Sequence, residues 1–157
     1  MTTGQLDNAC CVTGHREIPA EMLEFVENEL RKEITQAIKD GYTHFISGFA
    51  QGIDLLFVSI VVDQMVEYPD LTLEAAIPYR KRLSTPDPLF QRLLGNCKIV
   101  GIHSAEYSAA CYMKRNRVMV SNSKRVIVVY GGHQRGGTLY TMNYANMQHR
   151  EVRLIQI

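Results

Sequence analysis

Three glycine-containing stretches of this chain carry polar side chains that can bind an anion. They read TGHRE (13–17), SGFAQGID (47–54) and GGHQRGGT (131–138). Glycine lets the backbone turn sharply and lets a ligand come close to it. Arginine can grip a phosphate through its planar fork, and threonine can offer a hydroxyl group. These residue types therefore favour the binding of a phosphate-bearing ligand.

Strands and helices alternate in the predicted secondary structure that positions these stretches. Strands are predicted from short apolar runs at 9–13, 43–47, 71–77, 98–102, 125–130 and 152–157. Helices are predicted at 20–39, 54–66, 89–94, 113–121 and 138–148. Such alternation requires right-handed crossover connections between strands. We therefore expect an α/β fold, a Rossmann-like three-layer sandwich with a mainly parallel sheet.

Each glycine-containing stretch directly follows a predicted strand. The carboxyl ends of parallel strands share one edge of the sheet, so we expect the three loops to frame one pocket there. The helix N-termini behind such loops favour the binding of anions. The alternative is that the glycine-containing stretches are ordinary tight turns between a strand and a helix. The expected ligand-binding residues are Thr13, Gly14, His15, Arg16, Gly48, Ala50, Gly52, Asp54, Tyr79, Arg115, Asn116, Gly136, Gly137 and Thr138.

Their chemistry suggests distinct roles for these residues. The backbone N–H groups near the loop glycines would face phosphate, and Arg16 and Arg115 would supply positive charge. Asp54 and Asn116 would bond a ribose or a base. Alternatively, the negative charge of Asp54 would simply interact favourably with the positive end of the helix dipole. Thr138 would cap its helix or bond phosphate.

Two further assignments stay open at this stage. Tyr79 or Tyr130 would stack on a base, or would pack in the core with a bonded hydroxyl. Arg115 and Arg117 share one helical turn with Asn116, and we expect at least one of the two arginines to face solvent.

Length and composition limit the classes of function. The 157 residues suit one domain, 1–157, and the net charge of +1 gives no overall attraction to nucleic acid or membrane. No apolar run approaches the length of a membrane span, and the start of the chain lacks the pattern of a signal peptide. The expected location is therefore cytoplasmic. The four cysteines and five histidines lack metal-ligand spacing, so no metal and no resident cofactor are expected.

Taken together, several motifs resemble the SMF/DprA–LOG superfamily, called SLOG, and within it the YpsA-like branch. They are TGHR, SGFAQGID, IPY, CYMKRNRVMVSNSKRVIVVY and RGGTLYTMNYA. They follow the family's order and cover nearly the whole chain. The resemblance implies a Rossmann-like fold, a nucleotide-type pocket over the strand ends and homo-oligomers. DprA-like DNA-processing proteins carry a similar SGxAxGID turn, and LOG-type phosphoribohydrolases carry a similar GGT turn.

One departure from the LOG pattern bears on catalysis. LOG-type hydrolases place a glutamate three residues after the threonine of the glycine turn, where this chain has Thr141. Cleavage of an N-glycosidic bond passes through an oxocarbenium-like state that a carboxylate stabilises. Threonine carries no such charge. The sequence therefore favours a protein that holds its ligand over one that cuts it.

Three functions follow from these observations. The first is sensing or sequestering a nucleotide or a nucleotide-derived small molecule, such as an ADP-ribose-like signal. The alternative is a nucleotide N-glycosidase or phosphoribohydrolase. The second alternative is DprA-like binding of single-stranded DNA, which needs a basic track with stacking platforms. The apolar helix at 54–66 either lies under another helix or forms an interface in a homo-oligomer, and the interface is the interpretation that we favour.

Overall fold

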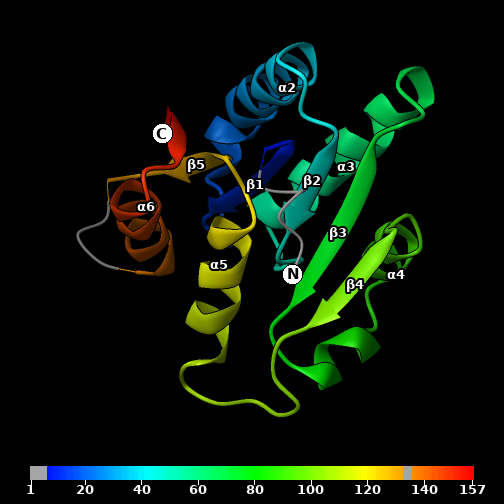
Figure 1. Cartoon of the computed structure of the whole chain (residues 1–157), viewed down its shortest axis with the longest axis vertical. Helices are drawn as coiled ribbons and strands as arrows, with labels where there is room; N and C mark the ends of the chain where they lie inside the picture. The colour runs from blue at the N-terminus through cyan, green and yellow to red at the C-terminus, as the bar shows by residue number, and fades with distance from the viewer. Residues whose placement is uncertain (1–6, 133–135) are drawn as a thin grey trace.

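Six parallel strands form one sheet in the order β4-β3-β2-β1-β5-β6. Figure 1 labels β1 to β5 of this sheet. The structure is a computed structural model that describes residues 7–132 and 136–157. The strands are β1 (Ala9–Gly14), β2 (His44–Ser47), β3 (Thr72–Ile77), β4 (Ile99–Ile102), β5 (Arg125–Tyr130) and β6 (Glu151–Gln156). The expected α/β fold with a parallel sheet is confirmed.

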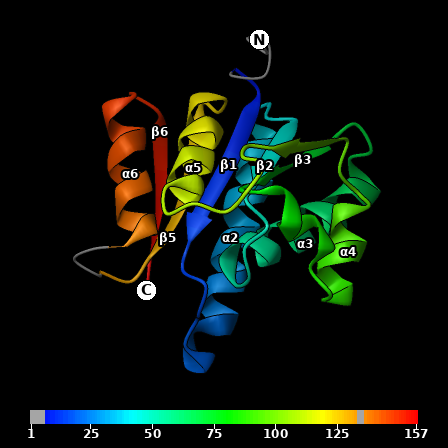
Figure 2. The same cartoon turned by 90° about the horizontal axis from the view of Figure 1, so that it is seen from below.

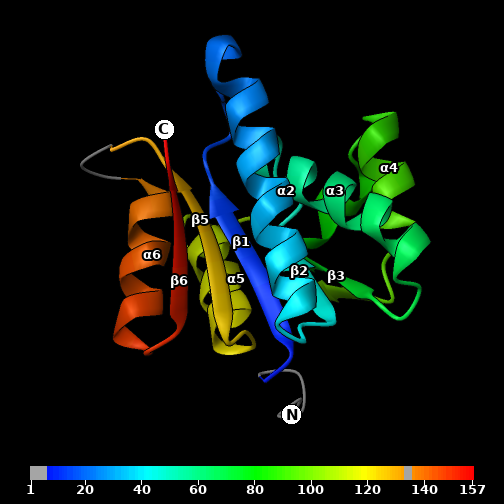
Figure 3. The ribbon, with the colours of Figure 1, turned by 90° about the horizontal axis from the view of Figure 1, so that it is seen from above.

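The helices cover both faces of this sheet. One face carries α2 (Leu23–Lys39), α3 (Ile53–Glu67) and α4 (Pro88–Leu94), and the other carries α5 (Cys111–Ser121) and α6 (Gly137–Met147). Accordingly, α5 lies in front of the sheet in Figure 2, and α2 lies in front of it in Figure 3. Two short 3₁₀ helices, η1 (Ala20–Met22) and η2 (Arg80–Ser84), complete the fold. The sequence predicts the first turn of 20–39 as α-helix, and it predicts no helix at 80–84.

The alternation of side chains along the strands builds two hydrophobic cores. In β1, Cys10 and Val12 join the core under α2 and α3, whereas Ala9 and Cys11 join the core under α5 and α6. The two adjacent cysteines therefore point to opposite faces, as the strand period of two residues predicts. Burial raises the pKa of the Cys11 thiol to about 12, so this thiol stays protonated at neutral pH.

Helix α3 is apolar on nearly every side because the chain itself covers it. It packs on β1 and β2, and α2 and α4 flank it. Phe57, Val58 and Val61 are fully buried, while Val66 at its end is 88% exposed. Packing within the chain accounts for the composition of this helix without a subunit interface. The homo-oligomer stays a prediction.

The direction in which the chain crosses the sheet reverses between β1 and β5. Strands β2, β3 and β4 follow on one side of β1, and β5 and β6 lie on its other side. The connection after β1 therefore leads to a helix on one face, and the connection after β5 leads to a helix on the other face. Open parallel sheets form a crevice at such a reversal, beyond the carboxyl ends of the strands.

Candidate functional site

Two adjoining cavities occupy the carboxyl edge of the sheet beside this reversal. The larger one, here called the inner cavity, has a volume of about 360 Å³, and the outer cavity has about 170 Å³. The inner cavity is lined by Val12, Thr13, Gly14, His15, Arg16, Ala50, Asp54, Tyr112, Arg115, Asn116, Gly137 and Thr138. The outer cavity is lined by Arg16, Gly48, Ala50, Gln51, Pro78, Arg82, Tyr112 and Arg115. The shared walls make them one cleft.

The loop after β1 is held tightly against its neighbours. A Cβ atom at Gly14 would lie 2.6 Å from the side chain of Ile53, so glycine permits the close approach of α3. Gly52 has a φ of +83°, and a Cβ there would collide with the carbonyl oxygen of Arg16. His15 Nε2 accepts a hydrogen bond of 2.9 Å from the N–H of Gly131. This bond leaves Nε2 unprotonated and ties the loop after β1 to the loop after β5.

The first turn of α3, which follows the loop after β2, places a buried carboxylate on the cleft wall. Asp54 is 8% exposed, and its Oδ2 accepts a hydrogen bond of 3.1 Å from the N–H of Ala50. Burial raises the pKa of Asp54 to about 6, and the positive charge of Arg115 works in the opposite direction. The carboxyl of Asp54 is therefore mostly ionised at pH 7, and it takes up a proton as the pH falls through about 6.

Arg115 is the buried cation of the cleft, with 4% of the residue exposed. Its Nη1 donates to the carbonyl of Gly48 at 2.7 Å and to that of Ala76 at 3.1 Å, and its Nε donates to Oδ1 of Asn116 at 2.7 Å. A Cβ at Gly48 would lie 2.5 Å from Nη1, so only glycine leaves room for this contact. Among the described residues, Nη2 has no acceptor, and Arg115 lines both cavities.

Asn116 links this arginine to the start of α6. Its Nδ2 donates to Oγ1 of Thr141 at 3.0 Å, and that hydroxyl donates to the carbonyl of Gly137 at 2.8 Å. Thr141 therefore uses its hydroxyl as both donor and acceptor within the fold. The side chain that stands at the glutamate position of LOG-type hydrolases thus holds α5 and α6 together.

The N-terminus of α6 opens into the inner cavity. Gly136 precedes the helix with a φ of +125°, and Gly137 and Thr138 line the cavity. The N–H of Tyr140 donates to the carbonyl of Gly136, so the N–H groups of the three residues before Tyr140 have no acceptor within the helix. These groups and the positive end of the helix dipole favour an anion.

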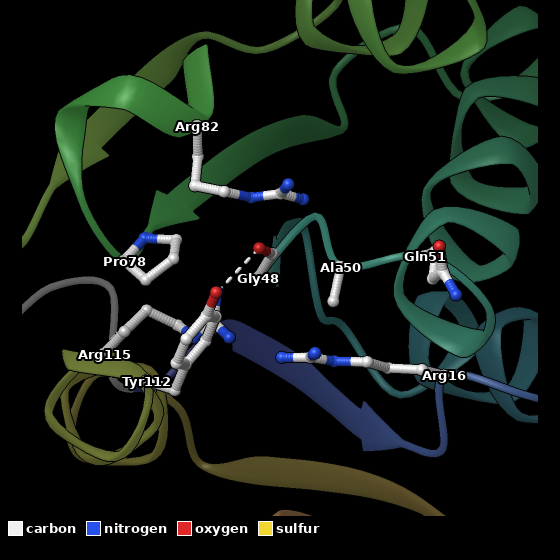
Figure 4. Close-up of a pocket in the computed structure, with 8 residues that line it drawn as sticks. All are labelled: Arg16, Gly48, Ala50, Gln51, Pro78, Arg82, Tyr112 and Arg115. Atoms are coloured by element: carbon white, nitrogen blue, oxygen red, sulfur yellow. Dashed lines mark hydrogen bonds between the residues drawn. The ribbon is translucent and has the colours of Figure 1, made fainter. Parts of the chain in front are cut away.

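Arg16 and Tyr112 stand between the two cavities. The Arg16 guanidinium carbon lies 5.0 Å from the centre of the Tyr112 ring, and that of Arg115 lies 5.7 Å from the same ring. Figure 4 shows Arg82 reaching from η2 into the outer cavity, opposite Arg16. Arg82 also lies 5.9 Å from the ring centre of Phe90.

The structure brings most of the sequence-predicted residues to this cleft. The predicted residues that line it are Thr13, Gly14, His15, Arg16, Gly48, Ala50, Asp54, Arg115, Asn116, Gly137 and Thr138. Gly52 lies beneath the backbone of Arg16, and Gly136 lines a groove between α5 and α6. Tyr79 contacts Tyr107 and Tyr112 edge-on, at 5.6 and 6.2 Å between ring centres.

Some lining residues escaped the sequence reasoning. They are Val12, Gln51, Pro78, Arg82 and Tyr112. Tyr112 precedes Arg115 by one helical turn, so the spacing on α5 could have identified it. Arg82 lies in a polar stretch without periodicity, and no signal in the sequence distinguishes it from its basic neighbours.

Two predictions concern parts of the chain outside the described residues. Arg135 of the RGGT motif and His133 of the same loop belong to 133–135, and the expected absence of a signal peptide rests in part on 1–6. Within the described ranges, no three His, Cys, Asp or Glu side chains are grouped so as to hold a metal ion. A search of those ranges also finds no helix with the length and apolarity that crossing a membrane requires.

The chain and its structure are similar to those of known proteins. A model of the YspA SLOG family (YpsA) matches residues 10–157, and no curated protein matches the chain. The structure is similar to DNA processing protein A (DprA) from Streptococcus pneumoniae, with a TM-score of 0.70 and 20% identity over 93% of this chain and 49% of that chain. It is also similar to DprA from Helicobacter pylori, described for its single-stranded DNA binding mode, with a TM-score of 0.69 and 16% identity over 97% of this chain and 67% of that chain. This chain thus spans about half of the pneumococcal protein, and these likenesses establish a shared fold.

Proposed function

The chain belongs to the YspA SLOG family, and from this premise we propose that its cleft binds a nucleotide or a nucleotide-derived small molecule without cleaving it. One observation carries the proposal. Gly137 and Thr138 at the open N-terminus of α6, the cationic Arg115 and the carboxylate-bearing Asp54 all line the inner cavity. The N–H groups and the guanidinium can donate to phosphate, and the carboxylate can accept from sugar hydroxyls or from a base.

The phosphate fits the positive side of the inner cavity. The N–H groups at Gly137 and Thr138 lack acceptors within α6, and Arg16 and Arg115 add two guanidinium groups to the same wall. Charge-assisted bonds from guanidinium and backbone donors are the strongest that a protein offers to phosphate. Binding of phosphate here would also compensate the buried charge of Arg115.

The sugar fits the side of the cavity at Asp54. Oδ2 of Asp54 accepts a hydrogen bond from the N–H of Ala50, so the other carboxylate oxygen can accept one from a ribose hydroxyl. Asn116 gives one amide hydrogen to Thr141 and accepts from Arg115, so its second amide hydrogen is available to a ligand. A ribose phosphate is therefore the part of the ligand that the cavity defines best.

Cleavage of the bound nucleotide is the weaker alternative. Among the described residues that line the cleft, Asp54 is the one carboxylate, and it is bonded to the backbone and opposed by Arg115. Glycoside hydrolysis ordinarily uses two carboxyl groups on either side of the scissile bond. We therefore propose that the ligand is retained intact.

Isothermal titration tests the proposal with AMP, GMP, CMP and UMP. We expect at least one of them to bind with a 1:1 stoichiometry and to be recovered unchanged by chromatography. Arg16→Ala should weaken binding about tenfold or more, because it removes one charge-assisted contact. Arg117→Ala is the matched control, since Arg117 is exposed and lines neither cavity. Absence of binding by all four nucleotides, or steady release of free base, would contradict the proposal.

A further inference from the structure

We propose that the outer cavity is a second anion subsite, and that the protein's ligand is a nucleotide with two separate phosphate groups or with a 5′-diphosphate. This inference rests on the proposed function, because it assigns the first phosphate and the sugar to the inner cavity. It concerns Arg82, Tyr112, Gln51 and Pro78, which that function does not require.

The charge of the outer cavity is the first observation. Arg16, Arg82 and Arg115 line it, and its described lining contains no carboxylate. The inner cavity differs, because Asp54 opposes the arginines there. Guanidinium groups that face one small crevice repel each other unless an anion lies between them. The outer cavity is therefore the more strongly cationic part of the cleft.

The availability of Arg82 is the second observation. Within the described residues, the side chain of Arg82 makes no ion pair and no hydrogen bond, and its guanidinium carbon lies 5.9 Å from the ring centre of Phe90. Phe90 is 1% exposed and stays fixed in the core. The guanidinium group points from η2 into the cavity toward Gly48 and Ala50 (Figure 4). All of its N–H donors can thus serve a ligand.

The volumes of the cavities define the size of the group that each can take. Pockets for small molecules usually measure about 300–1,000 Å³. The inner cavity of about 360 Å³ falls in this range, whereas the outer cavity of about 170 Å³ is too small for a complete nucleoside phosphate. A single phosphate group suits the outer cavity best.

Because the two cavities share a wall, one ligand can place a nucleotide in the inner cavity and a further phosphate in the outer one. Arg16, Ala50, Tyr112 and Arg115 line both cavities, so an anion in the outer cavity would lie next to a nucleotide in the inner one. Arg115 is buried, and its Nη2 has no acceptor among the residues that the structure describes, so this side chain brings a fixed donor to the wall that the two cavities share. A ligand that carries phosphate at both places would satisfy the donors of both cavities at once.

Titration of matched nucleotides tests this inference. For the base whose 5′-monophosphate binds most tightly, the 5′-diphosphate and the 3′,5′-bisphosphate are compared with the monophosphate. We expect one of the two to bind the wild-type protein at least about tenfold more tightly, since a charge-assisted contact to Arg82 is added. The preferred isomer shows whether the second phosphate extends from the first or leaves from the opposite side of the sugar.

Two variants separate this subsite from a general charge effect. Arg82→Ala should reduce the advantage of the second phosphate to about twofold or less and leave the affinity for the monophosphate unchanged. Arg80→Ala removes an exposed charge from the same 3₁₀ helix, lines neither cavity and should leave both affinities unchanged. Thermal melting confirms that both variants fold.

The outcomes distinguish this inference from the proposed function. Equal binding of all the phosphorylated forms, or an equal loss in both arginine variants, would overturn the second subsite while the monophosphate still binds. Failure of every mononucleotide to bind would overturn the proposed function and the second subsite with it.

Discussion

Asp54 and Arg115 face each other across Gly48, and the charge of each shifts the pKa of the other. A Cβ at Gly48 would lie 2.5 Å from Arg115 Nη1 and 3.0 Å from Asp54 Oδ2. Both side chains are nearly fully buried, and each also bonds to backbone groups of the neighbouring loops. The site therefore depends on a small glycine at the point where the two charges approach.

The raised pKa of Asp54 predicts a pH-dependent stability. Its pKa rises from 3.8 to about 6 on folding, so this group favours the folded state fully below pH 3.8, and that contribution is lost as the pH rises through 6. We expect Asp54→Asn, which cannot ionise, to unfold with a free energy about 3 kcal/mol higher than that of the wild type at pH 8. The difference should shrink toward zero as the pH falls to 4.

Urea denaturation at several pH values measures this difference. Asp63→Asn provides the matched control, because Asp63 is exposed on the same helix and pairs with Arg31 at the surface. A difference between Asp54→Asn and wild type that is constant with pH would contradict the assignment of the raised pKa to Asp54.

At the scale of elements, one chain of hydrogen bonds joins the loop after β2, α5 and α6. It runs from the Gly48 carbonyl through Arg115 and Asn116 to Thr141 and the Gly137 carbonyl. The elements that it joins lie on both sides of the reversal in strand order. The positions of the N–H groups at the start of α6 and of the buried cation Arg115 are thus coupled through protein bonds.

Thr141→Val should interrupt this chain while keeping the shape of the side chain. Thr141 is 3% exposed, and its part-buried bonds to the Asn116 amide and the Gly137 carbonyl would both be lost, at a cost of about 1–3 kcal/mol in the free energy of unfolding. Thr141→Ser keeps the hydroxyl and should retain most of the stability. Chemical denaturation of both variants tests this, and equal losses in the two would show that the methyl group, rather than the hydroxyl, matters.

The elements themselves were largely accessible from the sequence. The strand at 125–130 agrees with β5 (Arg125–Tyr130), and the helix expected at 54–66 agrees with α3 within one residue at each end. Glycines after apolar runs identified the loops because a parallel sheet brings all its strand ends to one edge. Periodicity and turn chemistry are local properties, and local properties can be read without a structure.

The outer cavity and the partners of buried side chains were not accessible in this way. Arg82 reaches the cleft because η2 turns back over the strand ends. A 3₁₀ turn of polar residues has no apolar periodicity from which the sequence could predict it. The bond between Asn116 and Thr141 joins residues from two helices, whose relative position depends on the packing of the whole sheet. The apolar surface of α3 suggested an interface because the sequence does not say that α2 and α4 cover it.

At the scale of the whole molecule, the near-neutral charge separates the proposed function from the binding of single-stranded DNA. The net charge is +1, whereas sequence-independent binding to nucleic acid draws its affinity from the release of many counterions. We expect oligothymidylate to bind no more tightly than the best mononucleotide at physiological salt. Fluorescence anisotropy at several salt concentrations measures this.

Tight binding with a steep dependence on salt would favour the DNA-binding alternative. The matched variant for that outcome is Arg117→Ala, which should weaken the binding of an extended strand along α5 and leave mononucleotide binding unchanged. The predicted homo-oligomer and cytoplasmic location stay predictions.

The order of the strands also determines when the cleft can exist during synthesis. Strands β1, β2 and β3 pair in the order in which a ribosome makes them, but the second edge of β1 has no partner until β5 has emerged. Pairings between distant parts of a chain form slowly, because the intervening segment must first be constrained. The open end of α6 and its bond to Asn116 arrive later still. A growing chain can therefore bury its first helices early, yet the cleft is complete only after α6 has left the ribosome.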